Sequence, residues 1–392
     1  MVKSGANMIS VSPENSGISG TSASVSIPLP RPVAPGGDRF GTHRVLDPSG
    51  GLPQPAERVD NDFSRLFAGE ILLAVETLNV DAASFRQMEE SSEGHLPEDL
   101  GGSVAAKVIS TVKARGKQHN PVTGSGGMLL GRVLQLAVIQ ENEKKEKKAT
   151  ASDLKVGDRV ATLVSLSLTP LRVDAVTAVR RESAQLDVRG EAILFASGAY
   201  AKLPDDMPDR LALAVLDVAG AAPQVARLVK KGQSVVVLGG GGKSGILCLA
   251  EARRRAGPNG RVIAVESFSK YADDVRALGI CDAVIEADAR DPVGVRRAVL
   301  EANGGNEVDV SFSCVNVEGA EMSAILSTRD RGVVYFFAMS TSFTKAALGA
   351  EGVGKDVDLM IGNGYAHEHA EHSIAMMREF PAIRALFEAR YS

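Results

Sequence analysis

The chain has 392 residues, of which 44% are hydrophobic and 23% charged, and its formal net charge is −4. These values are typical of a globular protein of about two domains, and the charge gives no reason to expect nucleic acid or an anionic membrane as a partner. No apolar run reaches the roughly 20 residues that span a bilayer. No charged segment followed by an apolar one begins the chain, so no signal peptide is predicted.

The cysteine pattern limits which disulfides and cysteine metal sites can be expected. Cys248, Cys281 and Cys314 are far apart in the sequence and form no C-x-x-C pair. They therefore predict neither a disulfide framework nor a cysteine zinc site, and a reduced, cytoplasmic location is the simplest expectation.

The first half of the chain begins with a polar tail and continues as a strand-rich segment. Residues 1–36 are rich in Ser, Gly and Pro, so they bury too little apolar surface to order, and we expect a disordered tail. Short apolar runs then favour a barrel-like, β-rich domain. We expect a short helix over 81–88, a turn-rich loop over 120–127 and a solvated charge run over 141–148. The expected strands cover short stretches near 40–45 and longer ones over 70–80, 104–112, 131–139 and 155–164.

The second half, from about residue 204, alternates between helical and strand patterns. This alternation argues for an α/β domain with a doubly wound parallel sheet. The expected strands are 234–238, 262–266, 283–286, 308–312 and 332–337. The expected helices are 209–228 with Pro223 as an interruption, 269–278, 292–302, 318–326, 369–379 and 381–389.

A glycine-rich turn between two of these strands is the strongest functional signal. The strand Ser234–Leu238 is followed by Gly239, Gly240, Gly241, Gly242, Lys243, Ser244 and Gly245. Three of the glycines satisfy G-x-G-x-x-G, which lets backbone N–H groups approach a pyrophosphate at a helix N-terminus. An NTPase phosphate loop would need a glycine five residues before Gly242, where this chain has Val237.

The end of the next strand carries a residue that could bind the ribose of the cofactor. Glu266 lies 21 residues after Gly245, at the spacing expected for a carboxylate that binds the adenosine ribose hydroxyls. This carboxylate favours NAD because it repels a 2′-phosphate. Ser267 and Lys270 nearby could accommodate that phosphate, so NADP stays an alternative.

The order of these parts resembles the medium-chain dehydrogenase/reductase superfamily from residue 40 onward. The segment Lys155–Val160, K-V-G-D-R-V, is similar to the entry into a strand of its GroES-like domain. The resemblance implies a GroES-like catalytic domain over 37–203, a Rossmann domain over 204–345 and a segment 346–392 that returns to the first domain. It also implies contacts to ribose and nicotinamide from Ser313, Cys314, Met339 and Ser340.

Two positions make this chain look like a zinc-free member of that superfamily. Asp81 stands where alcohol dehydrogenases carry a catalytic zinc cysteine, and Gly102 stands at the second zinc ligand. The four-cysteine structural zinc lobe is also missing. The resemblance therefore implies no metal.

A closer resemblance is to the L-erythro-3,5-diaminohexanoate dehydrogenase family of lysine fermentation. It implies oxidation of the C3 amine by NAD(P), followed by hydrolysis of the imine to 5-amino-3-oxohexanoate and ammonia. We expect a small diamino acid substrate and a homo-oligomer, a dimer or tetramer. The segments that carry this resemblance are 41–45, 52–55, 77–85, 120–128, 242–245 and 361–365.

Several polar residues are candidates for the chemistry. Asp81 could bind an ammonium group or act as the base, or it could simply cap a helix. His43 and Arg44 could supply a base and a carboxylate clamp, or could belong to a surface strand. Ser84 and Ser125 are further candidates for contact with the substrate.

A histidine-rich segment near the C-terminus adds a last candidate. Tyr365 is a candidate catalytic residue, and His367, Glu368, His369 and His372 follow it. A metal site could be read from this cluster, but solvent-facing histidines are the favoured interpretation.

Two other functions fit the same pattern. One is a zinc-free quinone or enone reductase, which would prefer an apolar pocket. The other is a non-catalytic redox sensor that binds a dinucleotide and a partner protein.

Overall fold

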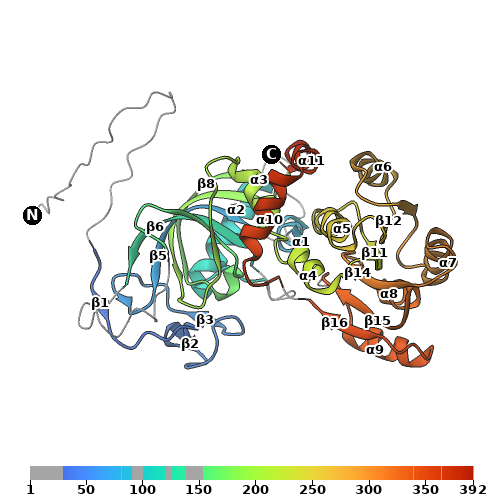
Figure 1. Ribbon diagram of the computed structural model, residues 1–392. Helices are drawn as coiled ribbons and strands as arrows, with labels where there is room; N and C mark the ends of the chain where they lie inside the picture. Colours follow the sequence, from blue (N-terminus) through green and yellow to red (C-terminus); the bar gives the residue numbers. More distant parts are fainter. Residues whose placement is uncertain are drawn as a thin grey trace, which may run out of the picture. The chain divides into compact units, whose positions relative to one another are not determined.

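The computed structural model describes residues 30–80, 82–90, 100–120, 126–137, 153–338, 340–362 and 364–391. The chain divides into two compact units, residues 1–199 and 200–392 (Figure 1). The expected domain boundary at residue 203 stays a prediction. The predicted tail before residue 30 and the charge run 141–148 lie outside the described residues.

The N-terminal unit is built on a six-stranded sheet, whose edge strand β10 (Tyr200–Lys202) begins at the first residue after the division. Its strand order is β10-β7-β6-β5-β9-β8, and the pairs β5–β6, β5–β9, β6–β7 and β8–β9 are antiparallel. The elements, in chain order, are β1 (Val33–Ala34), η1 (Thr42–Arg44), β2 (Val45–Asp47), β3 (Arg58–Val59), β4 (Leu66–Phe67), β5 (Ile71–Asn79), α1 (Ala82–Glu90), α2 (Leu100–Arg115), β6 (Met128–Leu136), β7 (Arg159–Thr162), η2 (Leu166–Leu168), β8 (Leu171–Arg180), β9 (Gln185–Leu194) and β10 (Tyr200–Lys202).

Helix α2 replaces a predicted strand. The β-branched residues of 104–112 favour a strand by propensity, but that prediction is wrong. Val104, Val108 and Val112 are all buried, and their spacing of four places them on one face of a helix. Burial of this single stripe, together with good helix formers between the valines, outweighs the weak local preference for β-structure.

Strands β8 and β9 were not predicted, although they form one edge of the sheet. Polar and charged side chains alternate with apolar ones along β8, so no long apolar run marks it. Close to residue 40, where a short strand was expected, the chain instead forms η1 and then β2.

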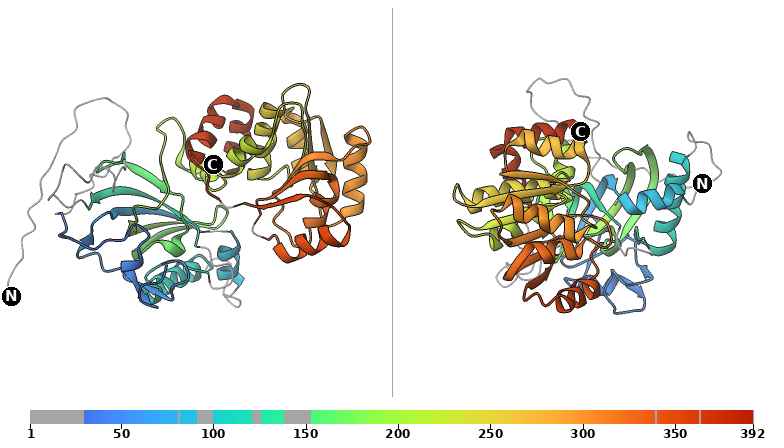
Figure 2. Two further views of the ribbon diagram at one scale, coloured as in Figure 1. Left: turned by 60° about the horizontal axis from the view of Figure 1, so that its bottom comes forward. Right: turned by 90° about the vertical axis from the view of Figure 1, so that its right-hand side faces the viewer.

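The C-terminal unit is a doubly wound α/β domain, as predicted. Its sheet has the order β13-β12-β11-β14-β15-β16, and every neighbouring pair is parallel. Figure 2 shows helices on both faces of this sheet. The elements are α3 (Asp209–Leu216), α4 (Ala221–Leu228), β11 (Ser234–Leu238), α5 (Lys243–Ala256), β12 (Arg261–Glu266), α6 (Ser269–Leu278), β13 (Ala283–Glu286), α7 (Pro292–Ala302), β14 (Val308–Ser313), α8 (Glu321–Ser327), β15 (Thr328–Phe336), α9 (Phe343–Gly352), β16 (Asp358–Ile361), α10 (His369–Glu379) and α11 (Pro381–Tyr391).

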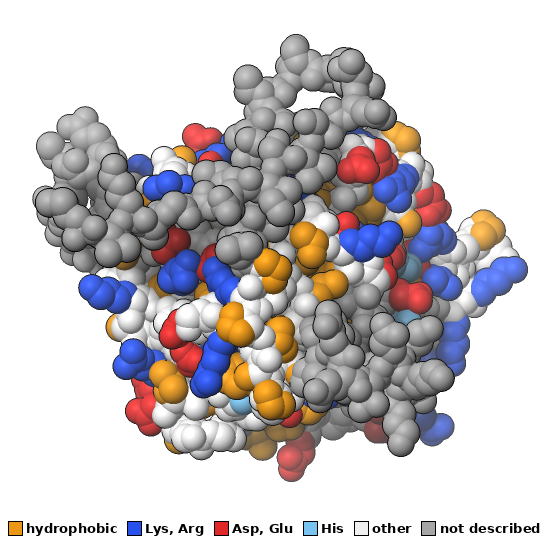
Figure 3. All heavy atoms as spheres, turned by 90° about the vertical axis from the view of Figure 1, so that its left-hand side faces the viewer, with side chains coloured by type: hydrophobic (Ala, Val, Ile, Leu, Met, Phe, Trp, Pro, Cys, Tyr) orange, Lys and Arg blue, Asp and Glu red, His pale blue; other side chains and the backbone are white. Residues whose placement is uncertain are grey.

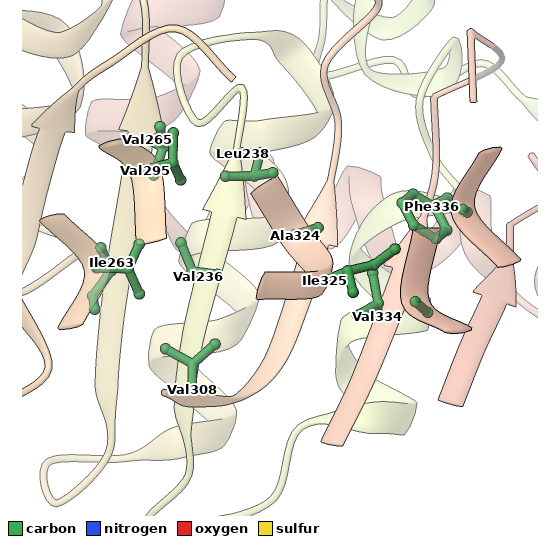
Figure 4. Packing of buried hydrophobic residues seen from close by; sticks show 13 residues of the cluster. Val236, Leu238, Ile263, Val265, Val295, Val308, Ala324, Ile325, Val334 and Phe336 are labelled. Carbon is green, nitrogen blue, oxygen red and sulfur yellow. The ribbon is translucent and has the colours of Figure 1, made fainter. Parts of the chain in front are cut away.

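An apolar core fixes one face of this sheet against α7, α8 and α9. Alternate residues of the central strands point into it, as the period of two in a strand requires. Leu238 of β11 lies next to Ala324 of α8, and Ile325 of α8 lies beside Val334 of β15 (Figure 4). This packing therefore makes the sheet a rigid support for the loops at the ends of its strands.

The last residues of the chain complete this unit. We expected residues 346–392 to return to the first domain, but β16 pairs with β15, and α10 and α11 pack on α3. Likewise, the predicted helix 209–228 breaks at 217–220 and not at Pro223, which sits in the first turn of α4 where its missing N–H is not needed.

Within the described residues, no single helix is long and apolar enough to cross a membrane, while the bent pair α3 and α4 meets that test by length and composition alone. Acidic and basic side chains are interspersed on the face drawn in Figure 3.

The helical assignment of α2 predicts different costs for two neighbouring substitutions. Val108→Ala should lower the free energy of unfolding by about 2 kcal/mol, because Val108 is fully buried. Ile109→Ala should change it by less than about 0.5 kcal/mol, because Ile109 is 37% exposed and alanine favours helix. Urea unfolding measures both. A larger loss at Ile109 would contradict this packing.

Candidate cofactor and substrate sites

A cavity of about 460 Å³ opens at the carboxyl ends of the strands in the C-terminal unit. In doubly wound sheets, ligands bind in the crevice outside these strand ends. The residues lining it come from the turns after β11, β12, β13 and β14: Gly239, Gly242, Val265, Glu266, Ser267, Phe268, Tyr271, Ala287, Asp288, Ala289, Arg290, Cys314, Val315, Asn316 and Val317.

The glycine turn on one side of this cavity needs its glycines for steric reasons. A Cβ on Gly245 would lie 2.0 Å from the carbonyl oxygen of Gly239, so no other residue fits there without moving the backbone. Gly239 itself has φ of 76°, in the left-handed region that glycine occupies at no steric cost. Helix α5 starts at Lys243, with Gly242 as its N-cap. The turn thus brings a helix N-terminus close to the cavity, as an anionic pyrophosphate requires.

Glu266 ends β12 and is held rigidly at the cavity wall. One carboxylate oxygen accepts a hydrogen bond from the N–H of Gly241 at 3.0 Å, and the other accepts from Ser267 at 2.8 Å and from Phe268 at 3.1 Å. The residue is 6% exposed and lines the cavity. A carboxylate oxygen has more than one acceptor site, so Glu266 can still accept from ribose hydroxyls.

The other predicted cofactor residues divide into those that line the cavity and those that do not. Ser267 and Cys314 line it. Gly240, Gly241 and Ser244 belong to the turn and the first turn of α5. Ser313 is buried within β14, and Lys270 is exposed on α6. Met339 lies outside the described residues.

Two predicted cofactor side chains have protein partners. Lys243 forms an ion pair with Asp217 at 2.6 Å, so in this structure its ammonium group is neutralised within the unit. The hydroxyl of Ser340 donates to the carbonyl oxygens of Val315 at 3.2 Å and Val317 at 3.3 Å. Ser340 therefore supports the loop that carries Val315 and Val317 at the cavity wall.

In the N-terminal unit, His43 and Arg44 have structural partners. Arg44 is fully buried and donates to both carboxylate oxygens of Glu70, at 2.7 and 2.8 Å, and to Asp60 at 3.0 Å. His43 contacts Glu70 through Nε2 at 2.9 Å, and its Nδ1 accepts from the N–H of Asp38. These contacts argue against two interpretations of His43 and Arg44: that they belong to a surface strand, and that they act as a base and a carboxylate clamp.

A polar pocket of about 160 Å³ lies around Ser84 in the same unit. Asn120 donates to the hydroxyl of Ser84 at 2.7 Å. Beside them, the Gln118 Oε1 and His119 Nδ1 atoms are buried without a hydrogen-bond partner among the described residues. Sequence reasoning missed both residues. Their only signal was a polar pair directly before the loop that begins at Asn120.

Burial shifts the titration of His119. Desolvation lowers the pKa of its imidazole below the ordinary value of 6.5, and the positive charges of Lys117 and Arg115 lower it further. The ring is therefore neutral at pH 7 and can accept a hydrogen bond at one nitrogen. Asp81 and Ser125, the other predicted substrate contacts, lie outside the described residues.

The predicted histidine cluster is dispersed. Tyr365 is 54% exposed, with its ring centroid 5.1 Å from that of His369, which is buried in α10. His367 is exposed as expected, whereas His372 contacts the buried Glu251 at 3.3 Å. Among the described residues, no group of three His, Cys, Asp or Glu side chains could hold a metal ion. Because Asp81 is not among them, the zinc-free expectation stays a prediction.

Comparison with known proteins places the chain in one family. The family model for the N-terminal domain of L-erythro-3,5-diaminohexanoate dehydrogenase matches residues 43–204. The chain is 52% identical to the L-erythro-3,5-diaminohexanoate dehydrogenase of Acetoanaerobium sticklandii, over 91% of this chain and 99% of that protein. This chain belongs to the L-erythro-3,5-diaminohexanoate dehydrogenase family. It is also 50% identical to the protein of that name from Fusobacterium nucleatum, over the same shares of both chains.

A solved structure supports the fold of this family member. The crystal structure of AibC aligns with 79% of this chain and 78% of its own, with a TM-score of 0.50 and 17% identity. At that identity the likeness concerns the fold alone. The closer resemblance predicted from sequence is thus confirmed by the relatives, and the α/β fold by the sheets themselves.

Gly245→Ala tests the glycine turn. The added methyl group would push α5 away from Gly239, so we expect dinucleotide affinity to fall at least about tenfold, that is, by about 1.4 kcal/mol. Gly102→Ala is the control, because a Cβ there meets nothing within 4 Å. Titration calorimetry with NAD and NADP measures both variants. Unchanged affinity in Gly245→Ala would contradict the steric argument.

Glu70→Gln tests the structural role of the buried cluster. Burial alone would raise the pKa of Glu70, but hydrogen bonds from Arg44 and His43 outweigh it and hold the pKa below its ordinary value of 4.5. This carboxylate therefore stabilises the fold above pH 4.5, and that contribution disappears as the pH falls toward the lower folded-state pKa.

The substitution should cost about 3 kcal/mol at pH 7, because it leaves Arg44 buried without its counter-charge. It should also flatten the loss of stability below about pH 4.5. Glu57→Gln is the control, because its side chain is 68% exposed in a surface ion pair with Arg115. Chemical unfolding across this pH range reads out both effects. Equal slopes in wild type and Glu70→Gln would count against the assignment.

Proposed function

We propose that this protein catalyses the NAD(P)-dependent oxidative deamination of L-erythro-3,5-diaminohexanoate to 5-amino-3-oxohexanoate and ammonia. The observation that carries the proposal is the 52% identity to a dehydrogenase of that name over 99% of its length. The glycine turn and Glu266 add support, because they fit a dinucleotide and both lie at one cavity.

The reaction sets chemical requirements for the protein. The C3 ammonium group must lose a proton, after which a hydride passes from C3 to the dinucleotide and the substrate becomes an iminium ion. Water then adds to the imine carbon, and ammonia leaves to give the ketone. The dinucleotide supplies the hydride acceptor, and the protein orients the substrate and provides the base.

The cofactor pocket leads us to propose a preference for NAD. Glu266 presents a fixed negative charge at the cavity, which would repel a 2′-phosphate. Lys270 does not line the cavity, and Arg290, which does, is paired with Asp288. Among the described residues that line this wall, no unpaired cation is therefore available to bind that phosphate.

For the substrate, we propose the pocket around Ser84. Its buried acceptors, Gln118 Oε1 and His119 Nδ1, suit an ammonium group, which donates hydrogen bonds and accepts none. Asp81 remains our proposed base or ammonium partner on sequence grounds, because it lies three residues before Ser84. A homo-oligomeric state and a cytoplasmic location also stay predictions.

Glu266→Gln should reduce the preference for NAD. A neutral amide accepts weaker hydrogen bonds than a carboxylate and no longer repels a phosphate. We expect the KM for NAD to rise about tenfold while that for NADP changes little, which narrows the preference by about 1.4 kcal/mol. Glu286→Gln, at the exposed end of the neighbouring strand β13, is the control. Unchanged preference in Glu266→Gln would remove Glu266 from the ribose site.

The activity itself is tested by mixing the purified protein with NAD and L-erythro-3,5-diaminohexanoate and following the nicotinamide absorbance. Reduction of NAD with equal release of ammonia is expected. Ser84→Ala should raise the KM for the diamine about tenfold without changing the affinity for NAD, whereas Ser110→Ala, on the exposed side of α2, should change neither. Turnover of enones or quinones in place of the diamine would instead indicate a reductase.

A further inference from the structure

A second polar cavity of about 460 Å³ lies in the C-terminal unit, against α4 and the ends of β15 and β16. Gln224 and Arg227 of α4, Tyr335 of β15, and Tyr365 and His367 of the following segment contribute to its wall. None of these residues lines the dinucleotide cavity. The residues proposed above for the dinucleotide and for the ammonium group of the substrate lie elsewhere.

The charge in this cavity is positive. Arg227 carries a full positive charge in the cavity wall, and no aspartate or glutamate lines that wall. Within the part of the chain that the structure describes, no carboxylate forms an ion pair with Arg227. His367 is exposed, and its Nδ1 lies 3.8 Å from a carboxylate oxygen of Glu368.

Tyr335 provides a hydrogen-bond donor that has no acceptor. Its side chain is 2% exposed, and its hydroxyl is buried without a hydrogen-bond partner among the described residues. Leaving such a group unsatisfied costs about 1–3 kcal/mol. Val334 and Phe336 point into the core beside α8, so the alternation of the strand directs Tyr335 to the opposite face, where α4 lies.

The phenol keeps its proton at neutral pH. Burial raises the pKa of Tyr335 to about 12, even though the nearby charge of Arg227 lowers it. The hydroxyl is therefore a donor under all ordinary conditions, and it lies within electrostatic reach of the guanidinium. Both groups can therefore donate hydrogen bonds to an anion.

We propose that this cavity binds a small carboxylate, with Arg227 donating charge-assisted hydrogen bonds and the Tyr335 hydroxyl donating to the same group. A planar guanidinium matches carboxylate geometry, and one cation balances one carboxylate charge. This carboxylate could belong to the diamino acid substrate, a source that rests on the proposed function, or to a separate organic acid.

Two variants separate these sources. Arg227→Gln removes the cation, and Tyr335→Phe removes only the hydroxyl from a ring that still fills its site. Lys230→Gln is the control, because it removes an exposed cation just beyond the same helix. The substrates are L-erythro-3,5-diaminohexanoate and 2,4-diaminopentane, which is the same diamine without the carboxylate.

If the substrate supplies the carboxylate, Arg227→Gln and Tyr335→Phe should raise the KM for the diamino acid about tenfold or more, and neither should change the KM for diaminopentane. If a separate acid binds, the substrate KM stays constant in both variants. Butanoate should then raise the melting temperature of the wild type and of Lys230→Gln, but not that of Arg227→Gln.

Constant substrate KM together with no effect of butanoate on the wild type would overturn the proposal. Tighter binding of inorganic phosphate than of butanoate would overturn the assignment to a carboxylate. Failure of the proposed function is a distinct result: the wild type would then not oxidise the diamino acid, while the butanoate experiment would still decide whether this cavity binds an anion.

Discussion

The contact on which the nucleotide site depends is the approach of α5 to the end of β11. Gly245 passes the carbonyl oxygen of Gly239 so closely that a single methyl group would not fit. That approach sets where the N-terminus of α5 points and where the N–H of Gly241 meets Glu266. Because the sheet beneath is clamped by the core on α7, α8 and α9, the turn cannot relax away from this geometry.

The two units use buried charge for different purposes. In the N-terminal unit, Arg44 and Glu70 satisfy each other within the protein, so they stabilise structure and have no capacity left for a ligand. In the C-terminal unit, Glu266 is held by backbone N–H groups and still lines a cavity. Whether a charged residue has spare hydrogen-bonding capacity is thus a better guide to function here than its charge alone.

The sequence predicted most of the C-terminal unit, because its strands are continuous apolar runs separated by strong punctuation. The spacing of Gly245 and Glu266 predicted a dinucleotide site, since a dinucleotide fixes the distance between them. The N-terminal unit was harder. The valines of α2 satisfy both a strand propensity and a helical spacing, and only the burial of Val104, Val108 and Val112 on one side separates the two interpretations.

His43 was a catalytic candidate because nothing in the sequence reveals that its ring contacts Glu70, 27 residues away. Gln118 and Tyr335 became candidates only when the fold showed that each has a buried polar atom with no partner among the described residues, and Arg227 only when the fold placed it in the same wall as Tyr335.

The account rests on the claim that the glycine turn and Glu266 form a seat for a nicotinamide dinucleotide. Calorimetric titration of the purified full-length chain with NAD, and separately with NADP, tests this claim without assuming any substrate. The account predicts saturable binding of one dinucleotide per chain, tighter for NAD. An absence of binding heat and of any melting-temperature shift with either dinucleotide would contradict it.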